Sequence, residues 1–265
     1  MDCKLKILYF QQKIIDITFE MFDILINIVY IMSNLKNDFV AACLDYFYLV
    51  DRHFPERGVL KLVGDRYRLD GDQRTILYRG ISSRERSELR ESLLETHIEG
   101  KVLVIDGYNV LFTLLNYRLG RVTFISTDNI LRDAGSLHGK FRDEKTFHEC
   151  IDLLIDYLVQ KKPVRVEVYL DSPVSHSEKH AHTIREKLEM RKINGDCLVV
   201  KSADWALKHN MQGILSTSDT AVIEKSMVRV FDLPRAILEE AYGAVFLKLS
   251  ELLIPDQIQN SVDKS

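Results

Sequence analysis

The sequence predicts an α/β protein with a mainly parallel sheet, preceded by a small, mostly helical module. From residue 100 onward, short apolar runs recur and end in an aspartate, as in Val-Leu-Val-Ile-Asp at residues 102–106. Amphipathic segments of helical length separate these runs. Such alternation is typical of parallel sheets with helices on both faces. Residues 34–98 show helical periodicity instead, which indicates a separate helical part.

The composition is that of an ordinary globular protein with room for one large domain or two modest ones. The 265 residues are 46% hydrophobic and 28% charged. Although the net charge is −3, residues 52–90 hold nine arginines and one lysine against six acidic residues. The four cysteines are scattered without the spacing of a zinc site or a disulfide framework. We therefore expect a reducing, cytoplasmic location.

The first 33 residues form an apolar segment whose origin the sequence leaves open. Phe22–Met32 is strongly apolar but too short for a confident membrane span, and its flanks do not match a signal peptide. Three interpretations remain: an extra amphipathic helix, an interfacial anchor, or translated sequence upstream of a true start at Met32. We favour the first and the third, and therefore expect no membrane association.

The helical module is expected over residues 34–98. Its first helix carries apolar side chains at the spacing of one helix face and is ended by a proline and a glycine. Val59–Val63 is a short apolar piece. Ser82, with Glu85 three residues later, matches a capping box that opens a charged helix. The expected helices are Asp38–Phe54, Asp72–Tyr78 and Ser82–Leu94.

The parallel sheet is expected over residues 100–253, followed by a polar tail at 254–265. The expected strands are Lys101–Ile105, Arg165–Leu170, Leu198–Val200, Gly213–Ser216 and Val228–Phe231. The expected helices are Glu144–Val159, Ser177–Lys192, Asp204–Asn210 and Asp219–Ser226, with a last helix after Pro234. Arg121–Ile125 is a candidate for a further strand within the long first crossover.

Four aspartates lie where parallel strands deliver side chains to one edge of the sheet. They are Asp106, Asp171, Asp204 and Asp219. Because the carboxyl ends of parallel strands meet at one edge, we expect the four carboxylates to converge. Gathered carboxylates repel one another unless a cation lies among them, and oxygen-only ligands indicate Mg²⁺ or Mn²⁺. Each aspartate alone is better explained as a helix cap or turn residue, whereas the set of four favours a catalytic metal site.

Short polar side chains beside these aspartates are candidates for binding substrate. Thr217 and Ser218 can position a water or a phosphate oxygen. Asn109 can hold a water or a backbone group, or can form an Asx turn. Ser175 precedes a helix whose free amides attract an anion, unless it is only the cap.

The long polar stretch at residues 126–142 has the composition of a functional loop. Asp128 and Asp133 within it, and Glu144 just after it, are further candidates for metal ligands. Arg132 and Arg142 are candidates for bidentate binding of phosphate.

The helical module offers basic side chains for a nucleic-acid backbone. Arg66, Arg74 and Arg79 are the candidates for binding phosphates, and Tyr67 and Tyr78 could stack on unpaired bases. Surface salt bridges to nearby aspartates explain the same arginines equally well.

Several motifs together resemble a known superfamily. The segment Val-Ile-Asp106-Gly-Tyr-Asn109-Val, with Tyr-Leu-Asp171, Ser-Ala-Asp204 and Ser-Thr-Ser-Asp219, resembles the PIN-like nucleases and most closely their NYN branch. From about Asn34 the chain also resembles an uncharacterised prokaryotic family of two parts, a helical leading domain and a PIN-like trailing domain. Its leading domain is marked by Gly64-Asp65-Arg66-Tyr67 and Arg74-Thr-Ile-Leu-Tyr-Arg79-Gly.

The resemblance implies a Rossmann-like sheet and cleavage of RNA or DNA that depends on Mg²⁺ or Mn²⁺. Many PIN nucleases carry an acidic residue on the helix after the first strand, and here Gly107–Asn116 has none. Asp128, Asp133 or Glu144 would have to substitute for it.

We expect a metal-dependent nuclease, with RNA favoured over DNA as the substrate. The four aspartates would hold one or two ions that activate a water and offset the charge of the scissile phosphate. One alternative is a non-catalytic RNA-binding or toxin-partner module. A second is a small-molecule phosphohydrolase, which is disfavoured because Tyr108 stands where the aspartyl-phosphate type needs a second aspartate. The sequence leaves the oligomeric state open.

Overall fold

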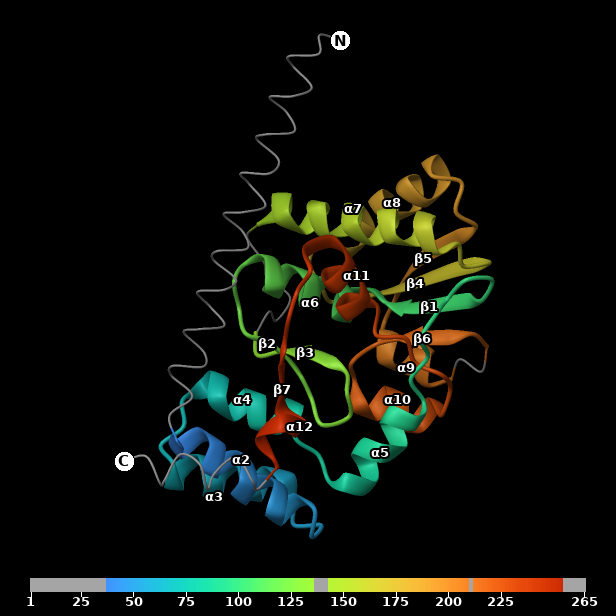
Figure 1. The fold of residues 1–265 in the computed structure, drawn as a ribbon. Coiled ribbons are helices and arrows are strands. Elements are labelled where there is room, and N and C mark those ends of the chain that lie inside the picture. Colours follow the sequence, from blue (N-terminus) through green and yellow to red (C-terminus); the bar gives the residue numbers. More distant parts are fainter. Residues whose placement is uncertain (1–36, 136–142, 210–211, 255–265) are drawn as a thin grey trace.

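A four-stranded parallel sheet forms the centre of the protein (Figure 1). The computed structural model describes residues 37–135, 143–209 and 212–254. The strand order is β5-β4-β1-β6, and every neighbouring pair is parallel. The strands are β1 (Val102–Asp106), β4 (Arg165–Asp171), β5 (Gly195–Val200) and β6 (Ile214–Ser216). The predicted α/β class with a parallel sheet is thereby confirmed.

Helices cover both faces of this sheet (Figure 1). One face is covered by α6 (Gly107–Arg118), α7 (Glu144–Lys161), α8 (Ser177–Met190) and α11 (Leu233–Tyr242). The other face is covered by α9 (Ala203–Lys208) and α10 (Thr220–Ser226). Leu103 and Ile105 of β1 pack into the first cluster, whereas Val104 packs into the second. The continuous apolar run of β1 follows from this burial on both faces.

A second, smaller sheet follows α6 and has the order β3-β2-β7. Its strands are β2 (Thr123–Ile125), β3 (Leu131–Asp133) and β7 (Leu247–Lys248). The first two form an antiparallel hairpin, and β7 pairs with β2 in parallel. The strand expected at Arg121–Ile125 therefore exists as β2, but it belongs to this separate sheet.

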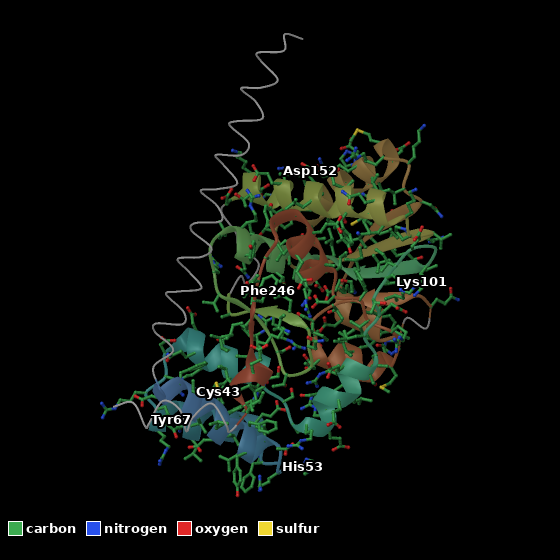
Figure 2. All side chains as sticks on the ribbon, in the orientation of Figure 1. Cys43, His53, Tyr67, Lys101, Asp152 and Phe246 are labelled. Carbon is green, nitrogen blue, oxygen red and sulfur yellow. The ribbon has the colours of Figure 1, made fainter. Side chains whose placement is uncertain are left out.

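The N-terminal part of the described chain is helical, as expected. Its helices are α2 (Asn37–Val50), α3 (Glu56–Arg66), α4 (Gly71–Gly80) and α5 (Arg84–Ser92). Cys43 lies in its core (Figure 2), which also takes in Phe124 of β2 and Leu249 of α12 (Leu249–Leu252). The helical module therefore shares its core with the small sheet and the C-terminal helix.

The structure differs from the sequence-based expectation at the start of α5. The predicted capping box at Ser82 is wrong, because the cap residue is Ser83 and its side chain makes no capping bond. The hydroxyl of Ser82 instead accepts a hydrogen bond from Arg90, at 2.5 Å. A complete capping box opens α4, where Asp70 and Gln73 bond to each other's backbone amides.

Two other predicted segments take different forms. Val59–Val63 lies within the longer helix α3. Val228–Phe231 is not a full strand, since Val230 alone forms isolated parallel bridges, to Leu94 and Leu215. None of the described helices is long and apolar enough to cross a membrane. The predictions for residues 1–33, for Arg142 and for the tail from residue 255 lie outside the described residues.

Candidate functional site

The carboxyl edge of the parallel sheet begins with Asp106, the last residue of β1. Its side chain is buried and caps α6, where one carboxylate oxygen accepts a bond from the backbone N–H of Asn109 at 3.4 Å. The other oxygen accepts a hydrogen bond from the Thr217 hydroxyl at 2.9 Å. Since Thr217 follows β6, this bond joins the ends of two neighbouring strands.

The loop after β6 is held against the start of α6. The side-chain oxygen of Asn109 accepts hydrogen bonds from the Ser218 backbone N–H at 2.8 Å and from its hydroxyl at 3.1 Å. Asn109 thus holds a backbone group, one of the roles expected from the sequence. Asp219 caps α10 by accepting a bond from the Val222 N–H at 2.8 Å, and only one of its oxygens is used in that bond.

The neighbouring strand β4 ends in Asp171, which positions α9. One oxygen of Asp171 accepts a bond from the Ala203 N–H at 2.8 Å, at the beginning of that helix. The side-chain cap of α9 is Ser202, so Asp204 in its first turn does not serve as a helix cap. Its carboxylate lies 4.0 Å from the Lys208 ammonium.

Charges of neighbouring aspartates contribute to the pKa of Asp106 and of Asp204. Burial, together with the charges of Asp204 and Asp171, raises the pKa of Asp106 to about 7, against the hydrogen bonds from Thr217 and Asn109. Burial also raises the pKa of Asp204, and Asp219 and Asp171 add to that rise. Asp204 is therefore the aspartate that links the other three, since its charge acts on Asp106 and the charges of Asp171 and Asp219 act on it. We call the four residues Asp106, Asp171, Asp204 and Asp219 the acidic edge.

The acidic edge does not form a complete metal site by itself. Among the described residues, no group of three or more histidine, cysteine, aspartate or glutamate side chains is arranged to hold a metal ion. The donor set itself, made of carboxylate and hydroxyl oxygens, is the chemistry that Mg²⁺ and Mn²⁺ prefer.

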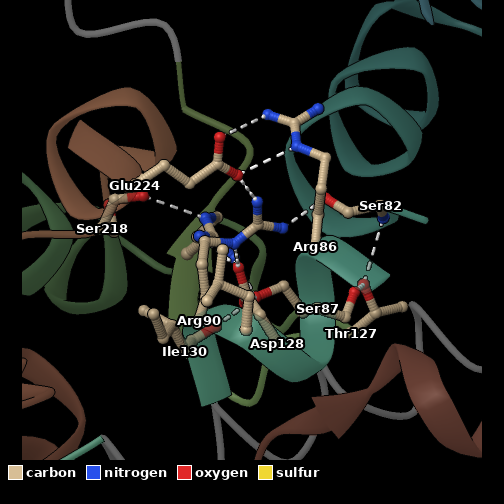
Figure 3. A network of polar contacts seen from close by, with 12 residues as sticks. Ser82, Arg86, Ser87, Arg90, Thr127, Asp128, Ile130, Ser218 and Glu224 are labelled. Carbon is tan, nitrogen blue, oxygen red and sulfur yellow. Dashed lines mark hydrogen bonds and ion pairs between the residues drawn. The ribbon is translucent and has the colours of Figure 1, made fainter. Parts of the chain in front are cut away.

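Asp128 lies in a buried network of polar contacts (Figure 3), and Arg132 pairs with it there. Both oxygens of Asp128 bond to Arg132, at 2.6 and 2.9 Å, and one also bonds to Arg90, at 2.5 Å. Although burial raises the pKa of Asp128, the two guanidinium groups hold it below its ordinary value. Both oxygens of Asp128 are therefore bonded to arginines, an arrangement that does not favour the predicted role of Asp128 as a metal ligand.

Arg132 is likewise engaged by other groups of the protein. Its guanidinium is buried against Asp128, and its Nε donates to the backbone oxygen of Ser218 at 3.1 Å. Arg132 thus fixes the backbone of the loop after β6 from the buried side. The described part of the polar stretch, residues 126–135, includes β3 of the β2–β3 hairpin, and its charged side chains Asp128, Arg132 and Asp133 are buried.

The network continues from α5 to α10. Glu224 of α10 pairs with both Arg86 and Arg90 of α5, and Arg86 also pairs with Glu56. Figure 3 shows Arg86 and Arg90 turned toward Glu224. Sequence reasoning missed these residues, since nothing local to α5 or α10 indicates that they pair.

The other acidic candidates lie apart from the acidic edge. Asp133 is buried and accepts bonds from Asn116 at 2.7 Å and Thr113 at 3.3 Å, further along α6. Glu144, in the first turn of α7, lies 3.5 Å from Lys179 and 3.8 Å from His148. Neither is among the acids that shift the pKa of Asp106.

A cavity of about 530 Å³ separates the helical module from the acidic edge. Asn109, Ser218 and Asp219 line it on one side. Arg74, Arg79, Arg86 and Arg132 also line it, together with Glu56, Tyr78 and several hydroxyl groups. We call it the arginine cavity.

Two of the three module arginines expected to bind phosphate line this cavity. Arg79 donates from Nη1 to the backbone oxygen of Asp133 at 2.7 Å and is about a third exposed. Arg74 bonds to Asp65 at 2.9 Å. Arg66 lies elsewhere, exposed over the Tyr67 ring and 3.8 Å from Asp45. The pair of Arg74 with Asp65 is one of the salt bridges that the sequence offered as the alternative to phosphate binding, whereas Arg66 pairs with the more distant Asp45.

Ser175 is exposed in the loop before α8. The cap position of that helix is His176, with a left-handed backbone and no side-chain capping bond. Ser175 is therefore not the cap, and the structure does not join it to the acidic edge through any described hydrogen bond.

Comparison with known proteins identifies two matching families. Residues 95–236 match the model of a "Domain of unknown function (DUF5616)", and residues 38–92 match a "Protein of unknown function (DUF434)". The chain is 31% identical over 198 residues to the uncharacterized protein MJ0935 of Methanocaldococcus jannaschii, which covers 74% of this chain and 94% of that relative. No solved structure matches significantly. These matches support the two-part family that the sequence predicts.

Proposed function

We propose that this chain, which belongs to the family of the domain of unknown function DUF5616, is a divalent-metal-dependent nuclease. The proposed domain is PIN-like and NYN-related, with Mg²⁺ or Mn²⁺ as cofactor and RNA preferred over DNA. One observation carries the proposal: Asp219, whose charge acts on Asp204 of the acidic edge, lines a cavity that arginines also line. Hydrolysis of a phosphodiester uses both, because arginines bind phosphate oxygens and carboxylates bind the metal.

The acidic edge would hold the metal through Asp106, Asp171, Asp204 and Asp219. When bound, the metal would lower the pKa of a water molecule and offset negative charge on the scissile phosphate. Mg²⁺ is usually bound by one or two carboxylates, several waters and phosphates of the substrate. A metal that is bound partly by waters and by the substrate needs fewer protein ligands, which is compatible with the lack of a preformed group of three ligands among the described residues.

The chain's own residues would orient the site before substrate arrives. The Thr217 hydroxyl fixes one oxygen of the Asp106 carboxylate. Asn109 and Arg132 hold Ser218 from two sides, which fixes the loop that carries Asp219. Such support from surrounding hydrogen bonds is what a catalytic constellation needs to keep its geometry.

The arginine cavity would bind the nucleic-acid backbone beside the acidic edge. Arg79 uses only Nη1 in its described hydrogen bonds, so its remaining N–H groups can turn to a phosphate. Arg74 lines the same cavity from α4. Contacts to phosphate carry no base information, so the cavity would position the strand without reading its sequence.

Cleavage of a mixed RNA pool tests the proposal. We expect cleavage in Mn²⁺ or Mg²⁺, none in a chelator, slower cleavage of a matched DNA pool, and loss of RNA cleavage in Asp106→Asn. The control is Asp152→Asn, an exposed aspartate on α7 (Figure 2) whose loss should leave cleavage unchanged. Equal rates of Asp106→Asn and wild type would overturn the proposal.

The alternative of a non-catalytic RNA-binding or toxin-partner module is favoured by a specific observation. A vestigial site would also lack a group of three metal ligands, as the described residues do. RNA binding with no cleavage in either metal would support it.

A small-molecule phosphohydrolase is favoured by the arginine cavity, because about 530 Å³ lies within the usual size of small-ligand pockets. Turnover of p-nitrophenyl phosphate, without cleavage of RNA, would support that activity.

A further inference from the structure

Trp205 is a large aromatic side chain that the fold leaves in solvent. It is the only tryptophan in the sequence, and it remains 65% exposed on the outer side of α9. Tryptophan is highly buried on average, and exposed aromatic side chains are enriched where proteins contact partners. The exposed indole of Trp205 therefore offers a flat apolar surface on which a flat ligand can stack.

The indole is held in place without being covered. The ring of His209 lies 4.5 Å from it, centroid to centroid, at an interplanar angle of 32°. Nδ1 of His209 donates to the backbone oxygen of Trp205 at 2.7 Å, which fixes the imidazole beside the indole. Ala203 and Leu207 of the same helix are fully buried, so α9 is a firm support for this pair.

Trp205 lies in the first turn of α9, the helix that also carries Asp204 of the acidic edge. It follows Asp204 in the chain, and the preceding Ala203 N–H donates to Asp171. A nucleic-acid strand whose phosphate was held at Asp171 and Asp204 would therefore pass close to the first turn of α9.

Resting on the proposed function, we propose that Trp205 is a stacking platform for an unpaired nucleobase of the strand held at the acidic edge. The substrate is therefore single-stranded nucleic acid. Stacking on an aromatic ring tolerates every base, because each has a π-face. Bases inside a duplex are already stacked and paired, so a duplex gains nothing from the platform.

Fluorescence of the single tryptophan tests this inference without any metal. In a chelating buffer, a short oligoadenylate should quench the emission of Trp205, whereas its duplex with oligouridylate and inorganic phosphate should not. Binding of labelled oligoadenylate, followed by anisotropy, should weaken about 5- to 100-fold in Trp205→Ala and be largely retained in Trp205→Phe. Met190→Ala, which removes a 71% exposed side chain on α8, should bind as wild type does.

The outcomes separate this inference from the proposed nuclease. If RNA binds without quenching the fluorescence, and binds Trp205→Ala as tightly as wild type, the stacking platform is overturned. The exposed indole would then be a candidate contact for a protein partner. Quenching by single strands with no cleavage in Mn²⁺ overturns the nuclease and keeps the platform. Cleavage in Mn²⁺ without quenching by single strands overturns the platform and keeps the nuclease.

Discussion

Asp128 offers the most direct test of how the interior of this protein is held. Its carboxylate is 0% exposed and lies between the guanidinium groups of Arg90 and Arg132. Asp128→Asn keeps the size of the side chain and removes its charge. Arg90 would then keep Glu224 as its charged partner, whereas Arg132 would keep only neutral oxygens, and both guanidinium groups are buried.

The expected loss of stability is large because no solvent compensates for the missing charge. Breaking a buried ion pair by removing one partner typically costs about 3–5 kcal/mol. For a chain of this length, about 1 kcal/mol lowers Tm by about 2–4 °C. We therefore expect Asp128→Asn to lower Tm by about 6–20 °C, with little dependence on salt, since buried pairs are poorly screened.

Thermal unfolding followed by circular dichroism, in a chelating buffer and again with Mn²⁺, measures the effect. The matched control is Asp152→Asn, which removes a surface ion pair with Lys187 and should change stability by about 1 kcal/mol or less. If Asp128→Asn melts like wild type in the chelator but loses a stabilisation that Mn²⁺ gives wild type, then Asp128 is a metal ligand. That result would refute the ion-pair assignment.

Three further predictions concern packing, pH and the acidic edge. A Cβ on Gly80 would stand 2.2 Å from Leu249 and 2.7 Å from Phe124, so Gly80→Ala should destabilise the protein by about 1–3 kcal/mol in urea unfolding. The matched control is Gly58→Ala in the first turn of α3, where a Cβ meets nothing within 4 Å and should stabilise the protein by about 0.4–1 kcal/mol. Burial raises the pKa of Asp232 from 3.8 to about 7, so the folded state binds its proton more tightly. Its contribution to stability is present below pH 3.8 and lost as the pH rises through about 7, and Asp232→Asn should flatten that decline in the free energy of unfolding. Thr217→Val removes a donor to Asp106 and should slow RNA cleavage about tenfold without a comparable loss of Tm; an unchanged rate would show that the bond is dispensable.

The parallel sheet could be predicted because its signals are local. The apolar run of β1 reports burial on both faces, and the apolar positions of α7 recur at helical spacing within a few residues. The ends of strands could be located from the abrupt change to polar residues, as at Asp106 and Asp171. Parallel topology then brings those ends together without any knowledge of side-chain contacts.

The buried arginines could not be predicted because their partners are distant in the sequence. From the sequence, Asp128 and Arg132 are expected to be exposed loop residues, since charged side chains in a polar stretch are usually in solvent. Their burial depends on Arg90, 38 residues away in another helix, which supplies the compensating charge. Arg66 and Arg79 also look alike in the sequence. Only helix packing decides that Arg79 reaches Asp133, whereas Arg66 remains on the surface.

The ion-pair network explains why the two parts of the chain form one unit. Arg90 belongs to the part that matches one family, whereas Asp128 and Glu224 belong to the part that matches the other. Alone, the helical module would expose the buried guanidinium of Arg90, and the α/β part would lose a partner of Asp128. Since Arg132 also holds the backbone of Ser218, docking of the helical module supports the acidic edge through Asp128 and Arg132. The helical module is therefore a structural component of the candidate site, not an accessory attached to it.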